Sequence, residues 1–285
     1  MRKFNIRWLV LTTLLLSSIL CSGCAAGNKK SAAENLNLVL AGMDGSDGVT
    51  FEGSSSLLLG GKPAPEAAVY FGGTVADHNK VSLYTLLPDG DTPKTAVRSE
   101  GNKLKSSSEG APAYYTKLEK KDGEWALLSE AGTAGGDSPL PALNPLRQLE
   151  ELQSLEKKVT EEAGAARGTR VLRIELSNAE ANRQLATELT RQMEAIRPEA
   201  SASGLKAADK GLESLQLLWV QKNKELQEKL KQASVETVYY LKADTKRNLP
   251  KRLSCTRKVS YSGVQGAAAA EEEIYLTEVN FYGYK

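Results

Sequence analysis

The chain contains a single histidine, His78, and this count limits the chemistry that its side chains could perform. His78 lies between Asp77 and Asn79 in a segment rich in turn-forming residues. Catalysis by a serine or cysteine nucleophile usually needs a histidine base, and zinc sites usually draw on several histidines and cysteines. The neighbours of His78 favour a polar residue in an exposed turn. We therefore expect neither a catalytic triad nor a zinc centre.

Three further patterns resemble parts of catalytic sites without completing them. Residues 203–206 match the Ser-x-x-Lys pattern of penicillin-recognising enzymes, but no Ser-Asp-Asn or Lys-Thr-Gly sequence follows them. Gly60, Gly61 and Lys62 resemble the end of a phosphate-binding loop, but Pro63 stands where a magnesium-binding hydroxyl is required. The acidic residues at 161–162 are neighbours in an expected strand and point to opposite faces, so they cannot flank one glycosidic bond. We expect no catalytic residue, no metal site, no cofactor and no enzymatic activity.

Cysteine chemistry is indicated at Cys24. Basic residues at the N-terminus precede the uncharged run Trp8–Leu20, which is the length of a signal-peptide core and is short for a membrane span. Small residues then lead to Cys24, and this sequence resembles the lipobox at which lipoprotein signal peptidase cuts, although Cys21 stands where Leu, Val or Ala is usual. The alternatives are an ordinary cleaved signal and an uncleaved anchor.

Cleavage there makes residues 1–23 a lipoprotein signal peptide and leaves Cys24 as the first residue, carrying lipid with palmitate-type acyl chains. We expect the chain to be lipid-anchored at the extracytoplasmic face of the cell membrane, or at the outer membrane in a Gram-negative cell. The small and polar residues 24–33 are predicted to form a flexible tether.

The charge balance of the remaining chain excludes one class of partner. Residues 1–23 hold three basic residues and no acidic one. Without them, 37 − 3 = 34 basic residues remain against 35 acidic ones. A nucleic-acid partner calls for a clustered positive surface, which the sequence does not indicate. Cys255 is then the one cysteine besides Cys24, and its place among apolar residues of an expected strand favours a buried thiol.

The elements that must position any site follow from capping signals and apolar periodicity. Ser31 with Glu34 forms a capping box, and Asn144 followed by Pro145 begins a second short helix. Elsewhere the apolar residues alternate with a period of two, and turn-forming segments at 62–65, 77–79, 88–90 and 122–123 favour antiparallel neighbours. The expected strands are 49–59, 68–76, 81–87, 95–106, 113–119, 124–128, 158–162, 170–176, 235–242, 252–261 and 274–284.

A helical insertion is expected at about 178–232. Asn178 is predicted to cap a first helix that ends before Pro198, and a longer, mostly charged helix should run from about residue 207 to residue 232. A coiled-coil seam is the alternative, but the apolar spacing is irregular and the run is short, so we expect the longer helix to pack on the sheet of its own domain.

Two C-terminal segments resemble LolA/LppX-like envelope lipoproteins, a family of outer-membrane lipoprotein carrier-like proteins. The segment Val235–Pro250 is similar to the late hairpin of that family, with an Asp-Thr-Lys turn and a Leu-Pro pair before the next strand, and Ile274–Tyr284 is similar to its closing strand. The resemblance implies an α+β fold in which an incomplete antiparallel β-barrel of about eleven strands has helices covering its open side. Residues 34–285 would then form a single half-barrel domain.

The resemblance also implies an apolar concave face that shields acyl chains from water. Burial of an acyl chain of about fifteen methylenes could contribute on the order of 10 kcal/mol before ordering costs. The candidate cavity residues are Phe51, Leu83, Leu172, Ile174, Tyr239, Leu253, Val259 and Phe281. The alternative is that these residues form the core beneath the helices.

Two functions follow as expectations. The first is a membrane-anchored extracytoplasmic lipoprotein that binds a lipid or other hydrophobic ligand in the half-barrel without catalysis. The second is a protein-interaction or sensor lipoprotein for cell-envelope, cell-wall or sporulation and germination machinery, with the charged long helix as the contact. The expected partners are the membrane and either a hydrophobic ligand or an envelope protein.

Overall fold

The computed structural model of this chain describes residues 30–87, 105–106, 114–131, 140–198, 209–261 and 272–284. The expected signal peptide, Cys24 and the tether up to residue 29 lie outside the described residues, as does most of the strand expected at 95–106. The described strands are β1 (Thr50–Leu59), β2 (Lys62–Ala76), β3 (Lys80–Leu87), β4 (Lys105–Ser106), β5 (Tyr115–Lys121), β6 (Glu124–Ala131), β7 (Lys157–Glu161), β8 (Thr169–Leu176), β9 (Ala233–Asp244), β10 (Pro250–Tyr261) and β11 (Glu272–Tyr282).

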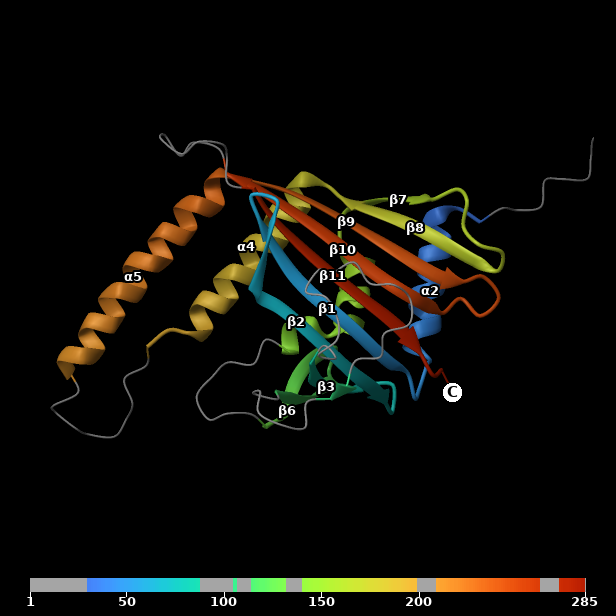
Figure 1. Cartoon of the computed structure of the whole chain (residues 1–285), viewed down its shortest axis with the longest axis horizontal. Coiled ribbons are helices and arrows are strands. Elements are labelled where there is room, and N and C mark those ends of the chain that lie inside the picture. The colour runs from blue at the N-terminus through green and yellow to red at the C-terminus, as the bar shows by residue number, and fades with distance from the viewer. Residues whose placement is uncertain are drawn as a thin grey trace, which may run out of the picture.

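The strands form one antiparallel sheet that does not close into a barrel (Figure 1). Its order is β6-β5-β3-β2-β1-β11-β10-β9-β8-β7, with β4 paired to β3. Most consecutive strands are neighbours, and β1 pairs with β11 where the first and last strands of the chain meet. Within the described part, β6 and β7 are the two ends of the sheet and do not pair with each other. The expected incomplete barrel with helices on its open side is confirmed.

One expected turn is wrong. Residues 62–65, with their two prolines, belong to strand β2, and the turn is made instead by Gly60 and Gly61. Both glycines have positive φ, as a two-residue hairpin turn requires. Proline is tolerated in this part of β2 because β3 pairs with Tyr70–Ala76, so among the described strands none pairs with the first half of β2 on that side and no donor is needed there.

Local capping residues explain where the helices begin. The described helices are α2 (Ala32–Asp44), the 3₁₀ turn η2 (Leu140–Leu143), α3 (Pro145–Ser154), α4 (Asn178–Ala195) and α5 (Asp209–Gln232). The capping box of Ser31 and Glu34 is present at α2, and the Asn144 side chain accepts a hydrogen bond from the Leu146 backbone N–H at α3. At α4 the cap is Ser177, one residue before the expected Asn178, and its hydroxyl accepts from the Glu180 N–H.

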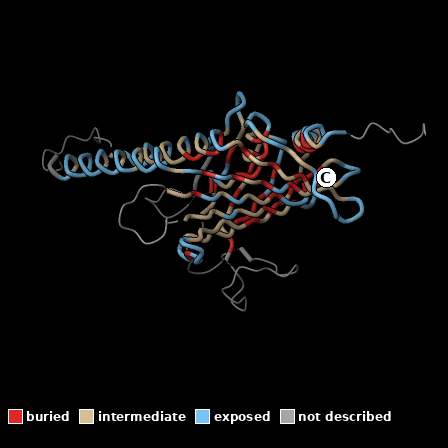
Figure 2. Tube along the Cα trace, turned by 90° about the horizontal axis from the view of Figure 1, so that it is seen from above, coloured by how far each residue is buried: buried red, intermediate tan, exposed pale blue. Residues whose placement is uncertain are grey.

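The hydrophobic core lies between the concave face of the sheet and three helices. Leu36, Val39 and Met43 of α2 are buried there, as are the leucines of α3 and the first turns of α4. Figure 2 shows this buried material concentrated inside the curved sheet. The helices therefore fill much of the half-barrel, and what remains open lies between α3 and α4.

Helix α5 projects beyond the sheet beside α4 (Figures 1 and 2). The Trp219 indole N–H donates to the Met193 carbonyl oxygen at 2.8 Å, and the Arg197 guanidinium lies 4.9 Å from the indole ring centroid. Only the end of α5, at Leu230, reaches the core. The longer helix thus packs along α4 instead of on the sheet, and several of its apolar residues stay exposed.

Among the helices that the structure describes, none combines the length and the apolar character needed to cross a membrane.

Candidate functional site

A cavity of about 470 Å³ lies between the concave face of the sheet and helices α3 and α4. This volume is within the range of roughly 300–1,000 Å³ that is usual for small-molecule sites. Strands β1, β9, β10 and β11 form its floor, and the two helices and η2 form its walls. Its lining residues are Ser55, Ala142, Leu143, Arg147, Gln148, Glu151, Leu155, Glu180, Arg183, Gln184, Thr187, Glu188, Tyr239, Cys255, Arg257, Tyr275 and Thr277.

The strand register builds the floor in two adjacent rows. One row crosses four strands and consists of Tyr239, Cys255, Thr277 and Ser55, which are direct partners from β9 to β1. The next row places Arg257 of β10 between Thr237 of β9 and Tyr275 of β11. Because alternate residues of a strand share a face, both rows point towards the helices. The floor is therefore polar, although the buried Leu253 and Val259 lie on the same face of β10 on either side of it.

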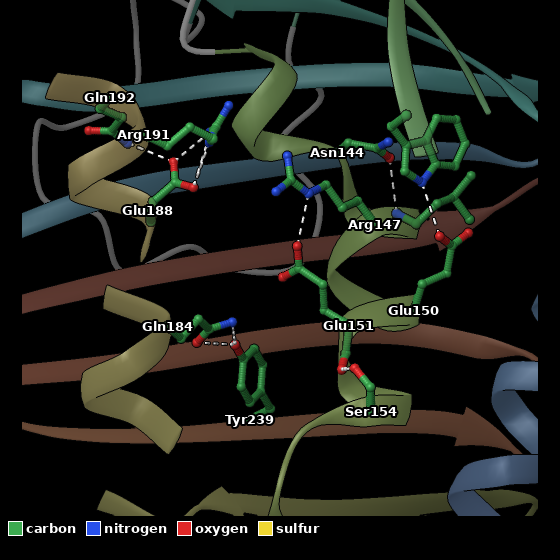
Figure 3. A network of polar contacts seen from close by, with 12 residues as sticks. Asn144, Arg147, Glu150, Glu151, Ser154, Gln184, Glu188, Arg191, Gln192 and Tyr239 are labelled. Carbon is green, nitrogen blue, oxygen red and sulfur yellow. Dashed lines mark hydrogen bonds and ion pairs between the residues drawn. The ribbon is translucent and has the colours of Figure 1, made fainter. Parts of the chain in front are cut away.

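The walls carry charged side chains that are paired on their own helices. On α3, the Arg147 Nε donates to Glu151 Oε1 at 2.8 Å, and on α4 Glu180 accepts from Arg183. Glu188 of α4 accepts from the guanidinium of Arg191, which does not line the cavity, at 2.9 Å. Figure 3 shows the Arg147–Glu151 pair on α3 and the Glu188–Arg191 pair on α4.

The hydroxyl and thiol groups of the floor stay neutral at physiological pH. Burial raises the pKa of the Cys255 thiol to about 11. Burial also raises the pKa of the Tyr239 and Tyr275 hydroxyls above their ordinary value. None of these three groups can offset a positive charge by ionising. The Tyr239 hydroxyl lies 3.5 Å from the side-chain amide of Gln184 on α4, and Figure 3 shows the two groups next to each other.

The structure places all eight predicted cavity residues on the inward face, nearly or completely buried. Only Tyr239 among them lines the cavity. The other seven, Phe51, Leu83, Leu172, Ile174, Leu253, Val259 and Phe281, pack in the core against α2, α3 and α4. A role for those seven in holding a ligand stays a prediction, and they act in the described fold as core residues.

Sequence reasoning missed the polar lining of the cavity. Arg257 carried the clearest signal, because it shares a strand face with Leu253 and Val259, which are buried. A charged residue in such a row interrupts the apolar pattern and calls for an explanation. The wall residues of α3 and α4 gave no comparable signal, since charged side chains on a helix are normally exposed.

The motifs that resembled catalytic sites take structural roles where the structure describes them. His78 is exposed in a turn, with Nδ1 3.1 Å from the Ser46 carbonyl oxygen. Glu161 lies 3.4 Å from Arg170 Nε, and residues 201–208, with the Ser-x-x-Lys pattern, lie outside the described residues. In the described ranges no three His, Cys, Asp or Glu residues are grouped so that they could hold a metal ion.

No protein-family model and no curated protein matches this chain. Among solved structures, it is similar to LprF from Mycobacterium bovis, with 10% identity over 89% of this chain and 92% of that one and a TM-score of 0.34. A structure of lipovitellin, described for its lipid–protein interactions, gives 6% identity, 83% coverage and a TM-score of 0.35, and this chain spans only 25% of its length. A DUF1329-family protein from Desulfovibrio piger gives 10% identity over 90% and 93% of the two chains with a TM-score of 0.25. At TM-scores this low, the basis for a function is the cavity of this chain itself.

Proposed function

We propose that this chain is a non-enzymatic lipoprotein that binds a lipid or other hydrophobic ligand in the cavity between its sheet and helices α3 and α4. The observation that carries the proposal is the cavity, which lies open between the sheet and helices α3 and α4 beside the packed core. Leucines 143 and 155, the rings of Tyr239 and Tyr275 and the stems of longer side chains supply much of its wall. Such mixed surfaces bury an apolar chain while polar groups fix its orientation.

Filling the cavity tests this function directly. The protein for this test begins at Ala25 and so retains every element that the structure describes. Thr277 lies on the cavity floor, so Thr277→Phe places a ring where the ligand would lie. The matched control is Thr74→Phe, because Thr74 is exposed on β2 and does not line the cavity.

Isothermal titration calorimetry with decanoate and 1-decanol gives the readout. We expect the parent chain and the Thr74→Phe variant to bind at least one of the two, and the Thr277→Phe variant to lose most of that binding. Circular dichroism checks that both variants keep the parent fold. Absence of binding by the parent chain, or equal binding by all three proteins, would count against the proposal.

A second candidate function is binding of an envelope protein through α5. The specific observation is that Leu217 and Val220 on α5 expose 66% and 57% of their surface, with Leu215 and Leu218 also exposed beside them. Apolar side chains grouped on a projecting helix are typical of a protein interface. Replacing Leu217 and Leu218 with serine should abolish cross-linking to that partner in the native envelope while decanoate binding persists. An unchanged cross-linking pattern would argue against this second function.

A further inference from the structure

Arg257 is a cation on the cavity floor without a carboxylate partner in the described structure. Its guanidinium donates one hydrogen bond, at 2.8 Å, to the side-chain oxygen of Gln184. The three carboxylates of the walls are already paired with arginines 147, 183 and 191 on their own helices. The floor therefore carries a positive charge that the described side chains do not neutralise by an ion pair.

Two polar atoms in this part of the floor also lack a hydrogen-bond partner among the described residues. The Arg257 Nε and the Thr237 Oγ1 are both buried and lack a partner in the described part of the chain. The two residues are direct partners across β9 and β10. The nearest inward acid along β11 is Glu273, and its carboxylate accepts from the hydroxyls of Tyr275, at 2.7 Å, and Tyr261, at 3.4 Å. The guanidinium as a whole therefore has few protein partners while it lines the cavity, so a ligand oxygen that accepts from it would be favoured.

We propose that Arg257 binds the anionic head, a carboxylate or a phosphate, of an amphiphilic ligand whose apolar part occupies the rest of the cavity. The proposal rests on the proposed ligand-binding function and names the chemical class of the ligand. A guanidinium presents parallel N–H groups that match two oxygens of a carboxylate or phosphate. Partial exclusion of water from the cavity strengthens that pairing.

The size and lining of the cavity favour an amphiphile over a free anion. A space of about 470 Å³ is much larger than a phosphate or an acetate ion needs. Leu143 and Leu155 on the wall, and the rings of the two tyrosines, offer apolar contact within the same cavity. A free anion would use the charge and leave this apolar surface in contact with water.

The test compares charged and neutral ligands of equal chain length. The probes are decanoate, decyl phosphate and 1-decanol below their aggregation concentrations, with acetate and inorganic phosphate as anions that lack a chain. The variants are Arg257→Gln and the control Arg167→Gln, since Arg167 is exposed in the turn between β7 and β8. We expect Arg257→Gln to weaken the binding of decanoate and of decyl phosphate by about 10- to 100-fold, which is the effect of losing a charge-assisted hydrogen bond. In the same variant, the affinity for 1-decanol should change by less than about twofold. Arg167→Gln should leave the affinities for all three ligands unchanged.

Cys255 reports where the ligand binds. In the chain that begins at Ala25 it is the single cysteine, and it lines the cavity beside Arg257. Decanoate should slow alkylation of this thiol by iodoacetamide in the parent chain, and acetate at the same concentration should not. Each variant is compared with its own rate without ligand, because burial raises the pKa of the thiol and the nearby Arg257 charge offsets part of that rise.

Each outcome separates this inference from the function on which it rests. Failure of both decanoate and 1-decanol to bind the parent chain would overturn the proposed function and the inference together. Equal affinities for decanoate and 1-decanol, or an unchanged decanoate affinity in Arg257→Gln, would overturn the inference alone. Equal weakening of all three ligands would show that Arg257 only maintains the cavity. Inorganic phosphate that binds as tightly as decyl phosphate would make the site one for a free anion.

Discussion

Asp244 controls the turn between β9 and β10 through a single carboxylate. One oxygen accepts hydrogen bonds from the backbone N–H groups of Lys246 and Arg247, at 2.9 and 3.0 Å, and the other lies 2.9 Å from the Lys251 Nζ. The bond to Lys251 and the two backbone donors favour the ionised form, so the pKa of Asp244 falls from 3.8 to about 2. The residue holds together the hairpin whose strand β10 carries Arg257.

This arrangement predicts a pH-dependent stability. Because the pKa of Asp244 is lower in the folded chain than in the unfolded chain, its contribution is complete above pH 4 and is lost as the pH falls towards about 2. We expect Asp244→Asn to be less stable than the parent chain at pH 7, with a difference that narrows across this window. Urea unfolding at a series of pH values measures it. The control is Asp122→Asn in the exposed β5–β6 turn, and a constant difference at all pH values would contradict the prediction.

At the scale of single residues, sequence predicted those whose role is local. Ser31 and Asn144 cap their helices because a cap is defined by neighbours a few residues away. Arg257 and Gln184 could not be paired from sequence, since 73 residues separate them and only the strand register and the position of α4 bring them together. The polar part of the site depends on such distant contacts.

At the scale of elements, strands β1 and β2 pack through two reciprocal pairs of phenylalanine and glycine. Phe51 lies opposite Gly73, and Phe71 lies opposite Gly53. A Cβ on Gly53 would lie 2.6 Å from the Phe71 ring and 2.6 Å from the Glu278 carbonyl oxygen. Each ring therefore occupies space that only a glycine leaves open, and the two strands bend closely around the core.

Gly53→Ala should destabilise the chain by about 1–3 kcal/mol, the usual effect of overpacking a core. The physical reason is that the Phe71 ring and the β11 backbone must both move to admit one methyl group. Chemical denaturation measures the loss. Gly211→Ala in α5 is the matched control, because nothing lies within 4 Å of a Cβ at that position. Equal stability of the Gly53→Ala variant and the parent chain would contradict this packing.

The strands were predictable as elements because alternation of apolar and polar residues has a short period. The ends of the strands were harder to predict. The prolines of β2 indicated a turn, but they lie within the strand where no described strand pairs with β2 on one side. Sequence also could not place α5. The spacing of its apolar residues is compatible with packing on a sheet or on a helix, and contacts such as that of Trp219 with α4 distinguish the two.

At the scale of the molecule, the open sheet, the filling helices and the cavity belong to one arrangement. The ends of the sheet at β6 and β7 stay apart, and α3, between them in the chain, packs on the concave side. Helix α2 lies at one end of the long axis of the molecule, and α5 projects at the opposite end (Figure 1). An anchor on Cys24 would therefore join the end that α2 occupies, through a tether of about ten residues with a reach of roughly 35 Å. A ligand of the cavity would then have to reach the protein at the membrane surface.

Lipid attachment at Cys24 can be tested in the native host. In the native host, the chain should incorporate an alkyne analogue of palmitate and sediment with membranes, because several acyl chains on one cysteine hold a protein where a single chain gives only marginal binding. Cys24→Ala should abolish the label and release the protein, whereas Cys21→Ala should keep both, since Cys21 belongs to the segment that cleavage removes. Cys255→Ala is the control for labelling inside the folded domain. Mass spectrometry should show that the mature chain begins at Cys24. Label that persists in Cys24→Ala, or a mature chain that begins elsewhere, would show that this cysteine is not the anchor and would free the protein to carry its ligand away from the membrane.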